Sequence, residues 1–304
     1  MELIFLGTGA GVPSKGRNVT SIALTMLNER NAIWLFDCGE ATQHQVLHSQ
    51  VKLSKIEKIF ITHLHGDHIF GLPGLLSSRS FQGGESTLTV YGPKGIQNFI
   101  ETSLKLSGTH LTYELKIEEI ESELIFEDSF GKVTAMELDH GVQSFGYRIE
   151  EADKPGALDA ERLIRDGVSP GPSFKILKEG GSLLLPDGRT INGNDYIGEP
   201  QKGRVLAIFG DTRSCKNENK LAYQADLIVH EATFEAEKGE MAAEYMHSTT
   251  AEAAELARDA EAKRLIITHI SSRYDKEASL RLVEEAREIF QATDIANDFD
   301  VFEI

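Results

Sequence analysis

The sequence contains a compact group of side chains that can bind a metal ion. His63, His65, Asp67 and His68 lie within six residues of one another, directly after the apolar run 59–61. Neutral imidazole and carboxylate are ligands that suit a borderline metal such as zinc. The run therefore predicts a metal site at the end of a β-strand.

Three further apolar runs end in residues of the same kind. They are 133–138 before His140, 205–209 before Asp211, and 265–267 before His269. Strand ends at one edge of a layered sheet hold loop residues in register, so we expect these side chains to meet.

Seven ligands are too many for one tetrahedral zinc ion, and two metals that share a carboxylate fit the number. We expect His63, His65 and His140 at one metal, Asp67, His68 and His269 at the other, and Asp211 between them. Two metals about 3.5–4 Å apart can lower the pKa of a shared water and clamp a phosphoryl oxygen. Hydrolysis is the expected chemistry.

Two other segments carry groups that could move protons. His230 and Glu231 follow the apolar run 227–229, and His247 precedes Thr249, which has capping-box spacing to a glutamate three residues later. A helix start beside His247 would favour an anion and disfavour imidazolium, which makes protonated His247 a readier acid. The alternatives are that His247 is a residue before a helix cap and that His230 is a hydrogen-bonded core histidine.

A basic loop follows the glycine-rich turn 7–11. Val12 stands where a dinucleotide fingerprint needs glycine, and Pro13 argues against a helix there, so no nucleotide cofactor is expected. Lys15 and Arg17, followed by Asn18, are candidate phosphate contacts; the alternative is an ordinary basic turn.

The elements that must position these groups are short strands alternating with helices. The strand-like runs 21–24 and 32–36 are close enough to form a hairpin. Helices are expected at 41–50, 71–80, 94–106, 251–260 and 278–290. This order predicts an α/β or α+β layered domain over residues 1–304.

The segment 151–199 differs from the rest, because prolines and glycines recur through it. We expect one short helix at 157–165 and a hairpin at 183–191, and we interpret the segment as an inserted arm. The alternative is an irregular surface excursion. Residues 150–200 hold six basic and ten acidic residues, and only Lys175 and Lys178 form a local basic cluster.

The composition sets the broad class. The 304 residues carry a net charge of −17, 40% are hydrophobic and two are cysteines. The charge argues against binding nucleic acid over the whole surface, and two cysteines exclude a disulfide framework. No apolar run approaches the roughly 20 residues that span a bilayer, and the first residues lack the pattern of a signal peptide. We expect a soluble cytoplasmic protein without membrane contact.

The metal-ligand pattern resembles the metallo-β-lactamase superfamily, whose members carry HxHxDH followed by His, Asp and His. The resemblance covers nearly the whole chain and implies a four-layer αββα sandwich with the metals at one edge between two sheets. Asp37 matches an early aspartate that is structural in that superfamily. His65 stands where flavodiiron members usually have glutamate, which favours zinc.

Within that superfamily, three motifs resemble the short form of the ribonuclease Z family. They are PxKxRN at 13–18, HEAT at 230–233 and HST at 247–249. The resemblance implies a zinc-dependent endoribonuclease with two Zn²⁺ per subunit. It would remove 3′ trailers from precursor tRNA by cutting after the discriminator base, which leaves a tRNA 3′-hydroxyl and a trailer 5′-phosphate.

The same resemblance implies roles for single residues. Asp67 would be both ligand and general base, His247 would protonate the departing 3′-oxygen, and Glu231 would orient His247. The arm, with Gly171-Pro172 near its middle and Lys175 and Lys178 beyond it, would hold the tRNA elbow, and the enzyme would be a homodimer. Arg273 matches the arginine of the family's AxR motif, although Ser271 replaces the alanine.

Three rival interpretations stay open from the sequence. A small-molecule hydrolase of the same fold would need neither the arm nor the PxKxRN loop. An RNA-binding homologue with an inactive centre would not need seven intact ligands. A DNA-processing nuclease of the superfamily would carry a much larger insertion. Manganese or iron is the alternative to zinc.

Overall fold

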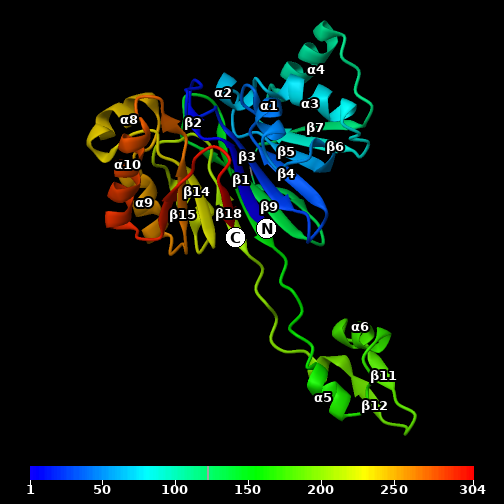
Figure 1. The fold of residues 1–304 in the computed structure, drawn as a ribbon. Coiled ribbons are helices and arrows are strands. Elements are labelled where there is room, and N and C mark those ends of the chain that lie inside the picture. The colour runs from blue at the N-terminus through cyan, green and yellow to red at the C-terminus, as the bar shows by residue number, and fades with distance from the viewer. Residues whose placement is uncertain (122) are drawn as a thin grey trace. The chain divides into compact units, whose positions relative to one another are not determined.

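The computed structural model describes residues 1–121 and 123–304. These residues form two compact units (Figure 1). Unit 1 comprises Met1–Ile149 and Val205–Ile304, and unit 2 comprises Glu150–Arg204. The segment 151–199 expected to be an arm lies within unit 2.

Unit 1 is built on two seven-stranded sheets. The first runs in the order β18 (Val301–Glu303), β1 (Glu2–Gly7), β3 (Ser21–Met26), β4 (Ala32–Phe36), β5 (Ile56–Phe60), β6 (Leu88–Gly92) and β7 (Leu115–Glu119). The second runs β17 (Thr293–Ile295), β15 (Leu265–Thr268), β14 (Leu227–Glu231), β13 (Val205–Ile208), β10 (Ser144–Glu151), β9 (Gly131–Leu138) and β8 (Glu123–Glu127). The short strands β2 (Gly9–Ala10) and β16 (Ile270–Ser271) pair in parallel.

Strand direction explains where loop residues gather. β4, β5, β6 and β7 are parallel in the first sheet, and β13, β14, β15 and β17 are parallel in the second. Neighbouring parallel strands end at the same edge of their sheet. The predicted hairpin is confirmed, because β3 and β4 pair antiparallel with Met26 opposite Ala32.

Helices cover the outer faces of both sheets (Figure 1). On the first sheet side lie α1 (Thr42–Leu47), α2 (Gly66–Ile69), α3 (Leu72–Phe81), α4 (Ile96–Ser107) and the 3₁₀ turn Leu53–Lys55. On the second lie α7 (Lys216–Ala222), α8 (Gly239–Tyr245), α9 (Thr250–Asp259), α10 (Lys276–Ile289) and the 3₁₀ turn Ala236–Lys238. All five predicted helices of this unit are present, although α1 is shorter than the predicted 41–50.

Three apolar clusters separate the layers. Trp34 and Phe60 of the first sheet pack with Tyr147 of the second in the space between the sheets. A second cluster joins the first sheet to α1, α3 and α4, and a third joins the second sheet to α7, α9 and α10. In β1, residues 3–6 are apolar and buried, and Phe5 contributes to the inner cluster while Ile4 contributes to the outer one. The expected αββα sandwich is confirmed.

Unit 2 has a small apolar core of its own. It contains α5 (Ala160–Arg165), α6 (Pro172–Lys178), the hairpin β11 (Ser182–Leu184) with β12 (Thr190–Asn192), and the 3₁₀ turn Gly193–Tyr196. Leu163, Leu177 and Ile191 from three of these elements pack together, so the segment is not an irregular excursion.

Two details of unit 2 differ from the sequence prediction. The helix expected from residue 157 begins at Ala160, because the side chain of Asp159 accepts a hydrogen bond from Arg162 N and caps it. The helix α6 was missed. It begins after Gly171, whose φ of 150° suits glycine, with Pro172 in its first turn and Lys175 and Lys178 in its last.

Among the residues described, no helix has the length and apolar character needed to cross a bilayer.

Candidate metal centre and acid pair

The seven predicted ligands lie at strand ends of the two sheets of unit 1. His63 and His65 follow β5, and Asp67 and His68 lie in α2 just beyond them. The other three are His140 after β9, Asp211 after β13 and His269 after β15. The structure therefore brings together all seven residues, from segments up to about 200 positions apart.

One group of four candidate ligands consists of His63, His65, His140 and Asp211. Nδ1 of His65 lies 3.1 Å from Nε2 of His63 and 3.3 Å from Nε2 of His140. Nε2 of His63 is 3.6 Å from Oδ2 of Asp211. One ligand atom from each of these four residues lies within 4.8 Å of the others.

The second group adjoins the first through Asp211. Oδ2 of Asp67 lies 3.4 Å from Nε2 of both His68 and His269. Oδ2 of Asp211 is 3.5 Å from Nε2 of His68 and 3.3 Å from Nε2 of His269. The same Asp211 oxygen thus faces both groups, as a bridging carboxylate would.

Hydrogen bonds on the far sides of the rings fix how these histidines are turned. Nδ1 of His63 lies 3.0 Å from Thr62 Oγ1, and Nδ1 of His68 lies 2.7 Å from Asp37 Oδ2. Nδ1 of His140 lies 2.8 Å from the Met246 carbonyl oxygen, and Nδ1 of His269 lies 2.9 Å from Thr233 Oγ1. In each case Nδ1 is occupied and Nε2 is left for the centre. Such outer contacts orient ligands and select their tautomer.

Asp37 lies behind the ligands rather than among them. It has a φ of 57° at the end of β4, and its carboxylate accepts hydrogen bonds from both the backbone N and the Oγ1 of Thr62. The same carboxylate meets His68. This is the structural role expected for the early aspartate.

The residues fit a metal pair in three ways. Nε2 of His68 is buried and has no hydrogen-bond partner among the described residues, which suits a nitrogen that would bind a cation. Burial lowers the pKa of His63, which favours the neutral imidazole that a ligand requires. At His68 burial acts in the same direction, but the Asp211 and Asp37 carboxylates raise its pKa, so this position favours a positive charge. Although burial opposes it, the surrounding histidines hold the pKa of Asp67 and Asp211 below their usual range. The donor set of imidazole and carboxylate favours zinc.

His247 forms an ion pair beside this cluster. Its Nδ1 lies 2.8 Å from Oε1 of Glu231, at the end of β14. Thr249 accepts a hydrogen bond from Glu252 N and begins α9, so the predicted capping box is confirmed. The ring of His247 lies 5.1 Å from that of His140 and 5.5 Å from that of His269.

For His247, the Glu231 carboxylate acts in the direction opposite to that expected from the helix start. The nearby helix start was expected to disfavour imidazolium. Burial would indeed lower the pKa of His247, but the Glu231 carboxylate and its hydrogen bond outweigh burial and raise the pKa to about 9. The contact with Glu231 decides the protonation state because the carboxylate is adjacent and buried.

Thr233, the last residue of the HEAT motif, is a candidate positioning residue to which the sequence reasoning gave no role. Its hydroxyl donates to Oε2 of Glu231 at 2.7 Å and lies 2.9 Å from Nδ1 of His269. His269 can donate to the hydroxyl oxygen while the hydroxyl proton goes to Glu231. Thr233 thus connects the His247–Glu231 ion pair to His269, one of the candidate metal ligands.

His230 is a hydrogen-bonded core histidine, which is one of the two alternatives that the sequence left open. It is buried, with Nε2 at 3.1 Å from Glu218 Oε1 and Nδ1 at 2.7 Å from the Glu231 carbonyl. It packs against Phe209 and supports the strand end that carries Glu231.

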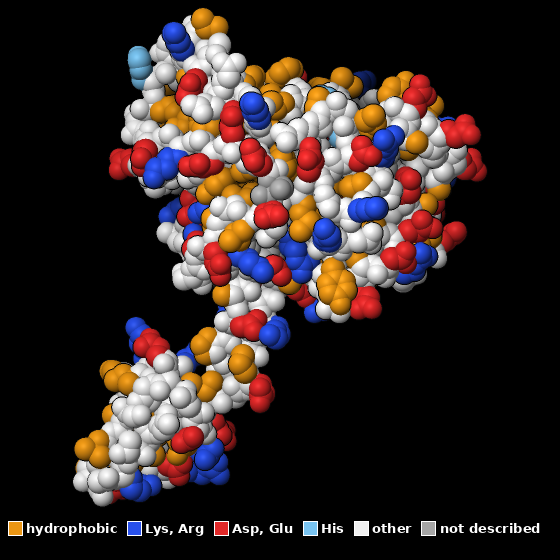
Figure 2. Space-filling model, turned by 180° about the vertical axis from the view of Figure 1, so that it is seen from behind, with side chains coloured by type: hydrophobic (Ala, Val, Ile, Leu, Met, Phe, Trp, Pro, Cys, Tyr) orange, Lys and Arg blue, Asp and Glu red, His pale blue; other side chains and the backbone are white. Residues whose placement is uncertain are grey.

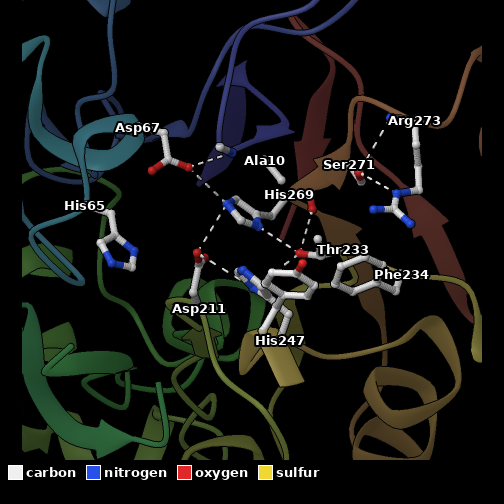
Figure 3. A pocket seen from close by; sticks show the side chains of 12 residues that line it. Ala10, His65, Asp67, Asp211, Thr233, Phe234, His247, His269, Ser271 and Arg273 are labelled. Carbon is white, nitrogen blue, oxygen red and sulfur yellow. Dashed lines mark hydrogen bonds and ion pairs between the residues drawn. The ribbon is translucent and has the colours of Figure 1, made fainter. Parts of the chain in front are cut away.

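A pocket of about 250 Å³ opens beside the ligands. Figure 3 shows Asp67 and His65 at one end, His269, Asp211 and His247 in the middle, and Phe234 and Arg273 at the other. The aromatic lining by Phe234 and Tyr245 was not anticipated, because neither residue follows a recognisable spacing.

The residues of unit 1 that were predicted to contact RNA differ in their exposure. Arg17 is buried, and its guanidinium donates to Thr8 Oγ1, the Ala296 carbonyl and Asn297 Oδ1, so it holds the loop in place. Asn18 Nδ2 donates to the Glu40 carbonyl. Lys15 is exposed and lines a second cavity of about 600 Å³, and Arg273 lines the pocket at the ligands. The contacts of these residues with RNA stay predictions.

The surface charge is mixed. On the face drawn in Figure 2, Lys and Arg side chains are interspersed with Asp and Glu. This agrees with the net charge of −17.

Comparisons with known proteins show what the chain is similar to. A family model described as "Anti-Pycsar protein Apyc1" matches residues 1–143. The chain is 67% identical over 304 residues to Ribonuclease Z of Listeria monocytogenes serotype 4a, covering 100% of this chain and 99% of the relative.

Two solved structures show the same fold. Human tRNase Z, short form, is similar with a TM-score of 0.74 and 32% identity, covering 100% of this chain and 99% of that one. The metallo-beta-lactamase fold protein YhfI from Bacillus subtilis has a TM-score of 0.68 at 20% identity, with the same coverage, and supports the fold alone. The full-length identity to curated relatives and the human structure together show that the chain belongs to the ribonuclease Z family of hydrolytic, tRNA-processing endoribonucleases.

Proposed function

We propose that this enzyme removes 3′ trailers from precursor tRNA by zinc-dependent hydrolysis directly after the discriminator base. The observation that carries the proposal is the geometry of two adjoining ligand groups that share Asp211, with the His247–Glu231 pair at their side. Family membership supplies the substrate class. The products would be a tRNA with a 3′-hydroxyl and a trailer with a 5′-phosphate.

Two zinc ions per subunit fit the ligand set best. His63, His65 and His140 would hold one, Asp67, His68 and His269 the other, and Asp211 both. Bound zinc would supply Lewis acidity that lowers the pKa of a water and stabilises charge on phosphoryl oxygens.

The chain's own residues would guide the protons. Asp67, whose Oδ2 accepts a hydrogen bond from Gly11 N, would take the proton of the attacking water. Nδ1 of His247 is held by Glu231, so Nε2 would give its proton to the 3′-oxygen as the phosphorus–oxygen bond breaks. A raised pKa keeps His247 protonated before that step.

Substrate binding is assigned more coarsely. Lys15, Arg17, Asn18 and Arg273 would serve the acceptor end, with Arg17 acting through the loop that it holds. Gly171, Pro172, Lys175 and Lys178, at the two ends of α6, would form a tRNA exosite in unit 2. A homodimer in the cytoplasm is part of the same proposal.

The test is incubation of purified enzyme with a 3′-extended tRNA transcript, followed by mapping of both product ends and elemental analysis. We expect a single cut after the discriminator base, two zinc ions per subunit and loss of cleavage with a chelator. Cleavage of a chromogenic phosphodiester without cleavage of the transcript by metal-loaded enzyme would instead support a small-molecule phosphodiesterase.

A further inference from the structure

The pocket at the metal ligands has an aromatic end. Tyr245 is the last residue of α8 and stands two positions before His247. It lines the pocket together with Phe234 and Arg273, and 61% of it is exposed. A largely exposed aromatic ring beside a polar reaction site has surface free to contact a ligand.

The buried ring of Phe234 lies next to that of Tyr245. Phe234 is 4% exposed, and its ring centroid lies 6.4 Å from that of Tyr245 with an angle of 29° between the planes. The Arg273 guanidinium lies 4.9 Å from the Phe234 ring centroid. After Tyr245 the chain turns through Met246 in the left-handed region, and His247 N donates to the Ala242 carbonyl. The position of Tyr245 is therefore tied to that of His247.

Resting on the proposed function, we infer that Tyr245, backed by Phe234, is a stacking surface for the base of the nucleotide on the 5′ side of the cut. Aromatic rings and guanidinium planes are the groups on which unpaired RNA bases stack. The pocket volume of about 250 Å³ leaves room for a base.

The side of the cut follows from His247. Its ring lies 6.2 Å from that of Phe234, so the aromatic end is on the same side as the proton donor. Asp67 and His65 line the opposite end of the pocket (Figure 3). The oxygen that His247 protonates belongs to the nucleotide 5′ of the cut. Tyr245 is therefore a specificity residue for that nucleotide and not for the trailer.

The test uses full-length, metal-loaded Tyr245→Ala and Tyr245→Phe with three transcripts. One is intact, one lacks the base 5′ of the cut, and one lacks the first trailer base. Tyr223→Ala is the matched control, since Tyr223 is 55% exposed at the end of α7 and does not line the pocket. Thermal midpoint and metal content are measured for each variant.

On the intact transcript we expect Tyr245→Ala to lose about 10-fold in kcat/KM, the order of one stacked base, while Tyr245→Phe and Tyr223→Ala stay near wild type. Removing the base 5′ of the cut should cost wild type a similar factor and cost Tyr245→Ala nothing more. A 2-aminopurine at that position should be quenched on binding to wild type and Tyr245→Phe, and not to Tyr245→Ala.

Three results would overturn the inference: unchanged cleavage by Tyr245→Ala, losses that multiply when the base is also removed, or coupling to the first trailer base instead. If wild-type enzyme leaves the intact transcript uncut, the proposed function fails and takes this inference with it. Cleavage by wild type with no effect of Tyr245 refutes the inference alone.

Discussion

Replacing Thr233 with valine should weaken metal binding, although Thr233 is not itself a candidate ligand. Valine keeps the shape of threonine and removes the hydroxyl. That hydroxyl donates to Oε2 of Glu231 at 2.7 Å and lies 2.9 Å from Nδ1 of His269. In Thr233→Val the Nδ1–H of His269 loses its acceptor, and Glu231 Oε2 keeps only the Thr233 backbone N, at 3.1 Å, among the bonds described for it.

The size of the effect follows from the two bonds. A hydrogen bond to a charged group contributes about 1.5–3 kcal/mol. Loss of an outer contact of a metal ligand typically costs about 10–100-fold in metal affinity. We therefore expect the second metal, at Asp67, His68 and His269, to bind about 30-fold more weakly in Thr233→Val.

The assay is zinc titration against a chromophoric chelator, with no RNA present. Thr233→Ser is the control, because serine restores the hydroxyl without the methyl group. We expect Thr233→Ser to bind zinc like wild type and Thr233→Val to lose zinc affinity at one of the two sites. Equal zinc affinity in Thr233→Val and wild type, or equal losses in both variants, would show that the hydroxyl does not position His269.

Three further predictions concern other parts of the chain. His247→Ala should lower kcat about 10²–10⁴-fold, as expected for loss of a general acid, with both metals retained by elemental analysis; near-normal turnover would remove His247 from the mechanism. Exchanging Lys175 and Lys178 for alanine should raise KM for precursor tRNA and spare a small phosphodiester, and equal loss on both would contradict an exosite on α6. Burial would raise the pKa of Glu151, but hydrogen bonds from Arg204 and Lys154 lower it from 4.5 to about 2. The contribution of the Glu151 carboxylate to stability is therefore fully present above about pH 4.5 and is lost as pH falls towards 2. Glu151→Gln should lower the thermal midpoint at pH 7 more than at pH 3. Equal shifts at both pH values would argue against this ion pair.

The convergence of the seven candidate ligands could be predicted from the sequence because each of them carries a local signal. Each ligand follows an apolar run, and four of them share one short segment. For Asp211 and His269, the parallel strands of the second sheet then bring their ends to a common edge. The same logic located Glu231, which ends β14 between the strands that lead to Asp211 and His269.

Side-chain partners could not be predicted in this way. Arg17 has the spacing of a phosphate contact, but its guanidinium meets acceptors near residue 296, brought close only by the fold. The helix α6 was missed because prolines and glycines around it imitate a loop. The protonation of His247 depends on a carboxylate 16 residues away, whose effect on the pKa of His247 exceeds that of burial.

The hydrogen bonds around Glu231 imply that its two proposed partners cannot be separated by changing Glu231 itself. One carboxylate oxygen meets His247, and the other meets Thr233 and, through it, His269. A change at Glu231 therefore disturbs both the proton donor and a metal ligand, and its loss of activity assigns neither role. His247→Ala removes the donor and Thr233→Val disturbs the ligand, so the double variant distinguishes the two. If the roles are independent, the losses in kcat should multiply. If His247 acts mainly by keeping Glu231 charged and thereby His269 in place, the double variant should lose little more than the worse single one.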